Sequence, residues 1–363
     1  MSQTNFFGGF FKGKRVLVTG HTGFVGRWLC RVLLHAGADI SGFSLDTPED
    51  RLLYEYNDNK ARHFQGDIRE KKLVKRIFDE INPEIVIHLA AQSRKDASIS
   101  DPDITFGTNV IGTFNILETS RCTDYVKSLV FASSEKVYKP QNWSWGYREV
   151  DELEGSDPFT ISKICCEQLI DSYRATFFND YKSMSLSCVR FGNAIGGGDY
   201  TNGKIISDCL IAAKEGTMIE MHDNETVRPY HHVLDTIRGL LIVAQRQYED
   251  KNCQGTYNVG PSPDGCAMTT DFVRLFCIEW GEGINSKLNI RNAEVDAPKA
   301  IRLDCSKISN SLLWTATWDV KKTVKKLVEF EKAVQNGKTA RGIMDNHIKE
   351  YYSEIKSPTN PCF

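Results

Sequence analysis

The chain has 363 residues, of which 41% are hydrophobic, and 45 basic against 47 acidic side chains leave a formal net charge of −2. This length suits one large α/β unit or two domains, and the balanced charge argues against a nucleic-acid or membrane-surface partner. The apolar runs are far shorter than the ~20 residues of a membrane-spanning helix, and residues 1–14 lack the features of a signal peptide. The 11 cysteines follow no metal-binding spacing and are expected to be reduced thiols of a cytoplasmic protein.

Strand and helix patterns alternate along the first half of the chain. Short β-branched runs predict strands at residues 15–19, 39–43, 85–89, 128–132 and 185–190. Apolar residues at helical spacing predict helices at residues 28–34, 73–81, 109–119 and 159–178. This alternation predicts an α/β fold, a doubly wound parallel sheet of the Rossmann type with right-handed crossovers.

The alternation ends after about residue 192. Isolated elements follow in a region rich in Gly, Asp and Asn, with helical patterns at 205–215, 232–248 and 270–279, a strand at 256–259 and a charged helical tail at 320–349. The sequence therefore predicts a dinucleotide-binding Rossmann domain over residues 1–192. A smaller C-terminal α/β substrate domain over residues 193–350, interleaved with the first, and a tail over 351–363 are expected to follow it.

A glycine-rich segment, TGHTGFVG at residues 19–26, follows the first strand and opens the first helix. Gly20 permits the tight turn, Gly23 lets the backbone approach a pyrophosphate, and Gly26 lets the helix pack on the strand. The start of the helix presents N–H groups and the positive end of its dipole. We therefore expect the phosphates of a dinucleotide over this loop, and the alternative is a purely structural turn. The remaining predicted cofactor contacts here are Thr22, Phe24 and Val25.

The end of the second strand leaves the choice between NAD and NADP open. Ser44 occupies the position where an acid would hold the ribose of NAD, and the carboxylate of Asp46 comes two residues late. Ser44, with Arg51 nearby, is equally suited to a 2′-phosphate. Asp67 and Ile68 follow a third short strand, where an acid can meet the adenine amino group. The alternative for Asp67 is a helix N-cap.

Further motifs add a family resemblance. The loop, the segments HLAAQ (88–92) and TNVIGT (108–113), and the helix with its Ser-Lys pair at 162–163 resemble the extended short-chain dehydrogenases/reductases. The segments WSWGYRE (143–149), GNAIGGGDY (192–200) and RPYHHV (228–233) are most similar to nucleotide-sugar 4,6-dehydratases of the CDP-glucose type. The resemblance covers residues 12–318 and implies further cofactor contacts at Leu89, Ala90, Ala91 and Thr108.

The resemblance implies an NAD-dependent lyase that oxidises C4 of a hexose, eliminates water across C5 and C6, and returns the hydride to C6. It assigns Lys163 to the cofactor and the catalytic pair, Ser134 to the C4 oxygen, and Lys136 to the C5 proton. Glu135 stands where the family usually has the aspartate that protonates the leaving C6 hydroxyl. Phe159 stands at the position of the catalytic tyrosine and has no proton to exchange.

Weakened or lost turnover is expected from Phe159. Three explanations compete: an engineered substrate trap, a natural homologue that moves the proton another way, and a non-catalytic nucleotide-sugar binder. The first is favoured, because the neighbouring residues largely keep the family pattern and phenylalanine preserves the volume of the ring. An epimerase or reductase of the same superfamily is a further alternative, although it would lack the acid and the base.

The resemblance also implies a nucleotide-sugar substrate, with a CDP-hexose favoured, and no metal. The substrate contacts that it implies are Gln92, Arg94, Asn193, Gly198, Lys204, Arg228 and Tyr230. For Arg228, the alternative is a surface ion pair with Asp223 or Glu225. The resemblance also implies a homodimer or homotetramer that packs through the helix at 159–178, and the wide apolar face of this helix is consistent with burial on two sides.

Overall fold

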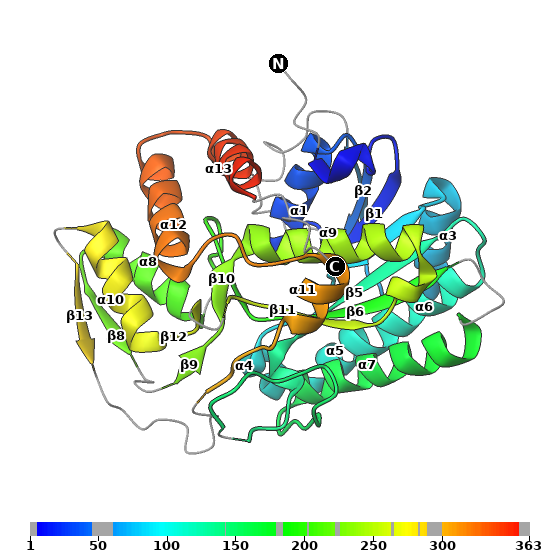
Figure 1. Ribbon diagram of the computed structural model, residues 1–363, viewed down its shortest axis with the longest axis horizontal. Coiled ribbons are helices and arrows are strands. Elements are labelled where there is room, and N and C mark those ends of the chain that lie inside the picture. The colour runs from blue at the N-terminus through cyan, green and yellow to red at the C-terminus, as the bar shows by residue number, and fades with distance from the viewer. Residues whose placement is uncertain are drawn as a thin grey trace, which may run out of the picture. The chain divides into compact units, whose positions relative to one another are not determined.

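The computed structural model describes residues 6–45, 61–141, 143–178, 184–201, 203–221, 226–262, 265–281, 284–288 and 300–355. The chain forms two compact units, whose elements are labelled in Figure 1. The first unit comprises Met1–Lys139, Glu149–Phe191 and Ile237–Tyr257, and the second comprises Pro140–Arg148, Gly192–Thr236 and Asn258–Phe363. Residues 237–257, beyond the expected boundary at 192, thus belong to the first unit, and residues 140–148 belong to the second.

Within the described residues, the first unit is built on a seven-stranded sheet with the order β11-β6-β5-β4-β1-β2-β3 (Figure 1). The strands are β1 Arg15–Thr19, β2 Asp39–Ser44, β3 Ala61–Gln65, β4 Ile85–His88, β5 Ser128–Ser134, β6 Ser185–Phe191 and β11 Thr256–Val259. From β3 to β6 the neighbouring strands pair in parallel. The strand order reverses direction between β1 and β4, and ligands of such sheets bind outside the carboxyl ends of the strands at this point. The predicted Rossmann architecture is confirmed.

Helices cover both faces of this sheet. They are α1 Phe24–His35, α3 Lys71–Ile81, α4 Lys95–Ser100, α5 Pro102–Phe106, α6 Gly112–Arg121, α7 Pro158–Phe177 and α9 Val233–Glu249. On one face, α3, α6 and α7 enclose a core that includes Phe78, Ile116 and Ile170, and α1 and α9 lie on the other side (Figure 1). Short helical turns occur at η1 Phe6–Gly9, η2 Gly107–Ile111, η3 Glu135–Val137 and η4 Lys251–Cys253.

The helix predicted over residues 109–119 has a different first turn. Gly107–Ile111 is a π-helical turn, and the regular α6 begins only at Gly112. The carbonyl oxygen of Asn109 accepts a bond from the thiol of Cys166 at 3.0 Å, which draws this turn toward α7. Single π-turns frequently mark functional sites.

The second unit has small sheets and a helical core. Its strands are β7 Asn193–Ile195, β8 Met218–Met221, β9 Val227–Arg228, β10 Tyr230–His232, β12 Ala267–Met268 and β13 Asn285–Leu288. Its helices are α8 Ile205–Glu215, α10 Thr269–Trp280, α11 Ser306–Leu312, α12 Val320–Gln335 and α13 Ala340–Glu354. The single helical tail predicted at 320–349 is two helices, because Gly337 adopts a φ of +78° between them. Tyr351 is fully buried in α13, and residues 356–363 of the predicted tail lie outside the described part of the chain.

Candidate active site

The glycine loop joins β1 to α1 at the switch point of the sheet. Gly20 has a φ of +70°, and a Cβ there would lie 2.7 Å from the backbone nitrogen of Ala90. A Cβ at Gly26 would lie 2.3 Å from the carbonyl oxygen of Gly20. Gly23 precedes α1 without a side-chain cap, and the first turn of the helix carries no acidic residue. These features suit the phosphates of a dinucleotide at the helix start. The same loop and first turn carry Thr22, Phe24 and Val25.

The end of β2 holds a small polar cluster in which His21 is central. Its Nδ1 lies 2.9 Å from Oγ of Ser44, and its Nε2 lies 2.8 Å from Nδ1 of His63. The imidazole lies against Gly42, where a Cβ would be only 2.2 Å from the ring. Burial, together with the proximity of His63, lowers the pKa of His21 to about 4, so the ring is neutral at pH 7.

Sequence reasoning did not single out His21, because a histidine inside a glycine motif gives no periodicity signal. Ser44 is buried, and its hydroxyl also lies 3.4 Å from the backbone nitrogen of Thr22. Asp46 and Arg51, the other residues weighed for the cofactor ribose, lie outside the described residues.

Asp67 and Ile68 follow β3. The carboxylate of Asp67 accepts bonds from the backbone nitrogen and the Nε of Arg69, both at 2.8 Å. Burial opposes ionisation of Asp67, but the Arg69 bonds hold its pKa below the usual value. Glu70, not Asp67, is the N-cap residue of α3. The carbonyl oxygen of the buried Ile68 accepts a bond from Asn115 at 3.0 Å, which fixes this turn against α6.

The segment after β4 is held by Asn109. Its side chain accepts a bond from the backbone nitrogen of Gln92 at 2.8 Å and donates to the carbonyl of Gln92 at 2.9 Å. The predicted cofactor contacts at residues 89–91 and Thr108 directly precede Gln92 and Asn109 in the sequence. The side-chain amide of Gln92 donates to the carbonyl of Arg94 and to Thr105, and Arg94 pairs with the exposed Asp96. The two bonds of Gln92 occupy its side-chain amide and disfavour its predicted contact with substrate, whereas the exposed ion pair of Arg94 is weak and leaves its predicted contact open.

Polar side chains gather where β5 ends. The hydroxyl of Ser134 donates to Oε2 of Glu135 at 2.8 Å, and the backbone nitrogen of Lys136 donates to the same hydroxyl at 3.2 Å. Glu135 is only 4% exposed, whereas Lys136 is exposed. The Nζ of Lys136 lies 5.8 Å from the centre of the Phe159 ring. The three residues predicted as acid, base and hydroxyl therefore lie together, and Lys136 lies next to Phe159, where the resemblance implies a tyrosine.

Helix α7 places Phe159 and Lys163 one turn apart. Asp157 caps the helix by accepting a bond from the backbone nitrogen of Thr160 at 2.9 Å. Lys163 is buried, and its Nζ donates to the carbonyl of Ala132 in β5 at 3.0 Å. Burial lowers the pKa of Lys163. The predicted lysine is thus held by a hydrogen bond to Ala132, near the carboxyl end of β5.

A buried ion pair supports this cluster from behind, and sequence reasoning missed it. Nη2 of Arg190 in β6 lies 2.5 Å from Oε2 of Glu167 in α7, and both side chains are at most 5% exposed. Ser133 donates to the same carboxylate, and Nη1 of Arg190 donates to the hydroxyl of Tyr138 at 2.9 Å. Glu167 lies one helical turn after Lys163, and this spacing could have indicated that Glu167 shares the buried face of α7. The pair ties β5, β6 and α7 together.

The second unit holds the remaining predicted substrate residues. Asn193 and Tyr230 lie opposite each other in the parallel pair of β7 and β10. Tyr230 is 2% exposed, and its hydroxyl lies 3.1 Å from that of Thr269, so it is a core residue rather than an accessible contact for a ribose. Arg228 is half-buried and donates to the carbonyl of Val227 at 3.2 Å. Its expected partners Asp223 and Glu225 lie outside the described residues.

The glycine segment that follows β7 is already bonded within the unit. The backbone nitrogen of Gly198 donates to the fully buried carboxylate of Glu331 at 3.2 Å. Lys204 pairs with the buried Asp199 at 2.9 Å. A carboxylate therefore takes the Gly198 N–H that was expected for a pyrophosphate. This contact was invisible to sequence reasoning because Glu331 lies 133 residues away.

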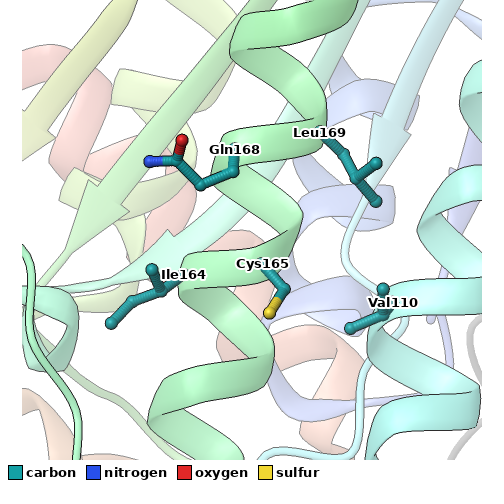
Figure 2. A pocket seen from close by; sticks show the side chains of 5 residues that line it. All are labelled: Val110, Ile164, Cys165, Gln168 and Leu169. Atoms are coloured by element: carbon teal, nitrogen blue, oxygen red, sulfur yellow. The ribbon is translucent and has the colours of Figure 1, made fainter.

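Figure 2 shows an apolar pocket on the surface of the first unit. Ile164, Cys165, Gln168 and Leu169 of α7 line it together with Val110 of the π-turn η2. The pocket belongs to the wide apolar face that was predicted for this helix.

The sheet order, the glycine loop and the lysine-bearing α7 define a Rossmann-type protein of the extended short-chain dehydrogenase/reductase class. Residues 16–260 match the NAD dependent epimerase/dehydratase family, and the chain belongs to this family. Among the described residues, no helix has the length and apolar character needed to cross a membrane.

Individual relatives within this family are nucleotide-sugar 4,6-dehydratases. The chain is 35% identical to a CDP-glucose 4,6-dehydratase of Salmonella typhimurium, over 95% of this chain and 98% of the relative. It is 25% identical to a dTDP-glucose 4,6-dehydratase of Haemophilus influenzae, over 82% and 92%. Among solved structures, an epimerase of Methanothermobacter thermautotrophicus aligns with a TM-score of 0.80 at 20% identity, covering 94% of this chain and 99% of that one. This last likeness shows the shared fold.

Proposed function

We propose that the protein is an NAD-dependent nucleotide-sugar 4,6-dehydratase that converts CDP-glucose to CDP-4-keto-6-deoxyglucose. The observation that carries this proposal is the cluster at the end of β5, where Ser134, Glu135 and Lys136 lie beside α7. An epimerase or reductase needs no acid and base for elimination. The 35% identity to a CDP-glucose 4,6-dehydratase supports the same conclusion and favours the CDP-hexose.

NAD, when bound, would supply the acceptor for the C4 hydride and the donor that returns it to C6. The glycine loop fits its phosphates, because the first turn of α1 offers N–H groups with no competing acid. Among the described residues, neutral His21 and Ser44 at the end of β2 offer no positive charge to a 2′-phosphate, which favours NAD over NADP. Lys163, anchored on Ala132, is placed to orient the nicotinamide ribose.

The side chains at the end of β5 divide the remaining work. Ser134 holds the C4 oxygen, Lys136 removes the C5 proton once C4 is a ketone, and Glu135 protonates the C6 hydroxyl as it leaves. The burial of Glu135 strengthens its interactions with substrate and keeps bulk water from competing. Phe159 itself supplies no proton acceptor, so turnover is expected to be weaker than with a tyrosine at this position. A second candidate, a nucleotide-sugar binder without catalysis, is favoured by Phe159 alone.

The pocket of Figure 2 supports a further proposal, that two copies associate through α7 and η2 as a homodimer, or as a homotetramer built from dimers. Ile164, Leu169 and Val110 supply apolar surface of the kind that protein interfaces bury. A cytoplasmic location also stays a proposal, supported by the free cysteines of the described chain.

The experiment that tests the dehydratase is Phe159→Tyr. Restoring a positioned acid/base is expected to raise formation of the 4-keto-6-deoxy product from CDP-glucose by about 10²-fold or more. Phe177→Tyr, at the far end of α7 and 39% exposed, is the matched control and should leave the rate unchanged. Absence of product in F159Y, with CDP-glucose still bound, would favour the binder. Thermal shifts with CDP-glucose, dTDP-glucose and GDP-mannose test the nucleotide, since the true ligand stabilises according to its affinity.

A further inference from the structure

We propose that Ser134 and Glu135 form a proton relay that takes the C4 hydroxyl proton in place of a tyrosine, and that Glu135 then delivers this proton to the leaving C6 hydroxyl. The inference rests on the proposed function and deepens it. It gives one carboxyl two successive roles. It also links the two departures from the family pattern, because the glutamate at position 135 would compensate for the loss of the tyrosine at position 159.

The relay is already assembled in the protein. The hydroxyl of Ser134 donates its only proton to Oε2 of Glu135 at 2.8 Å. One of its two lone pairs accepts the backbone N–H of Lys136 at 3.2 Å. The other lone pair remains to accept a proton from a bound sugar hydroxyl. Because Glu135 is 4% exposed, the proton that it gains is shielded from exchange with bulk water.

Neighbouring groups are less suited to accept this proton. Phe159 has no ionisable atom. The hydroxyl of Tyr138 is 2.9 Å from Nη1 of Arg190, a permanent donor that occupies it as an acceptor. Nζ of Lys163 donates to the carbonyl of Ala132 at 3.0 Å. Lys163 is the strongest competing candidate for the proton acceptor, and the experiment below distinguishes it from Glu135.

The length of the glutamate side chain explains the contact. Its carboxylate turns back onto the hydroxyl of the residue immediately before it. An aspartate is one methylene shorter, so the same backbone would hold its carboxylate about a bond length farther from this hydroxyl. A chain that lacks the phenol at 159 but carries the longer acid at 135 thus keeps a route for the first proton.

The proton count closes over the cycle. As the C4 hydride leaves to the oxidised nicotinamide, the C4 O–H bond breaks, its proton passes to Ser134, and the proton of Ser134 passes to Glu135. The C4 oxygen becomes a ketone. Lys136 takes the C5 proton, the C6–O bond breaks, and the proton of Glu135 completes the water molecule. Glu135 is again a carboxylate, and Lys136 returns its proton to C5 when C6 receives the hydride.

The test isolates the first step. CDP-6-deoxyglucose has no C6 hydroxyl to eliminate, so its C4 oxidation is read from the absorbance of the reduced nicotinamide in single-turnover mixing. We expect E135Q to slow this oxidation by about 10²-fold or more in the native background. In the F159Y background, where a phenol is available, E135Q should slow it by less than about 10-fold. Glu152→Gln, on an exposed glutamate paired with Lys139, is the matched control.

The conservative variant E135D gives the reciprocal result. It should slow oxidation in the native background, because the contact with Ser134 is lost, yet support it normally with F159Y. Infrared difference spectra supply a readout independent of turnover: a protonated carboxyl band should appear with the reduced nicotinamide and be absent in E135Q. Calorimetry with CDP-6-deoxyglucose should show retained binding in every variant.

Other outcomes would overturn the relay. Equal slowing by E135Q in both backgrounds would reduce Glu135 to a positioning residue. Unchanged oxidation in the native background would assign the proton to Lys163. Failure of the proposed function is distinguishable, because F159Y would then give no product from CDP-glucose, whether or not calorimetry still detects CDP-sugar binding.

Discussion

Close backbone approaches set the requirement for glycine at the cofactor loop. Gly26 lies in the first turn of α1, where a Cβ would lie 2.3 Å from the carbonyl oxygen of Gly20 and 2.6 Å from the Cα of His21. Backbone atoms cannot swing away as the end of a side chain can. The loop must therefore move if any side chain is added at this position.

Gly26→Ala is accordingly expected to cost about 1–3 kcal/mol of stability and to weaken NAD binding, because the loop is pushed out of its phosphate-binding form. Denaturant unfolding and calorimetric titration with NAD measure the two effects. Gly342→Ala is the matched control: Gly342 is also the third residue of its helix, but the nearest atom to its Cβ position is the Thr339 hydroxyl at 3.2 Å. Equal effects of the two substitutions would contradict the argument.

At the scale of elements, α7 organises the site through both of its faces. Its inner face carries Phe159, Lys163 and Glu167, and its outer face lines the pocket of Figure 2. The Glu167 carboxylate meets Arg190 of β6 in a fully enclosed pair, which also holds Ser133 and Tyr138. A buried charge that loses its partner is left uncompensated, which is strongly destabilising.

Glu167→Leu alone should therefore destabilise the protein by about 3–5 kcal/mol, because Arg190 is left buried without its partner. The double variant with Arg190→Met replaces the whole pair by apolar groups and should recover most of that loss. Urea unfolding of the native protein, the two single variants and the double variant forms a complete cycle. A double variant as unstable as the sum of the singles would refute the coupling.

The outer face of α7 gives a prediction about assembly. Ile164→Arg places a charge in the pocket, where an associated copy would have to bury it, so the proposed dimer should dissociate to monomers. Analytical ultracentrifugation at several concentrations measures the effect. Ile278→Arg is the control, since Ile278 lies on α10 and is 74% exposed. Unchanged sedimentation of I164R would place any assembly contact elsewhere.

At the scale of the whole molecule, several histidines are buried in their neutral form. Burial lowers the pKa of His88 to about 3, and that of His231 and His347 to about 4, as it does for His21. In the unfolded chain these groups titrate at about 6.5. Below that pH the unfolded state binds more protons than the folded state. Their contribution to stability is therefore complete above pH 6.5 and is lost as the pH falls toward 4.

We expect the midpoint of thermal unfolding to fall from about pH 6.5 to pH 5, each such histidine removing about 1.4 kcal/mol of stability per pH unit within the window. His347→Gln should reduce the dependence of the unfolding free energy on pH by the equivalent of one proton, whatever the effect of the substitution on stability at pH 7. A midpoint that stays constant down to pH 5 in the native protein would show that these imidazoles are not buried neutral.

The sequence alone determined the Rossmann sheet, the glycine loop and the position of the lysine on α7. These features are local, since strand periodicity, a glycine triplet between strand and helix, and a one-turn spacing are each written within a short segment. The same reasoning identified Phe159 and Glu135 as departures from the pattern. Which contacts these departures make remained open at that level.

Tertiary structure decided the contacts between distant segments. Arg190 and Glu167 are 23 positions apart in the sequence, and Gly198 and Glu331 are 133 apart. The buried Tyr230 contacts Thr269, which is 39 positions away. Periodicity cannot report such contacts, because side chains far apart in the sequence meet only once the layers pack. The bond from Ser134 to Glu135 is local in sequence, but its burial comes from the packing around the end of β5, and that burial makes it a candidate proton route.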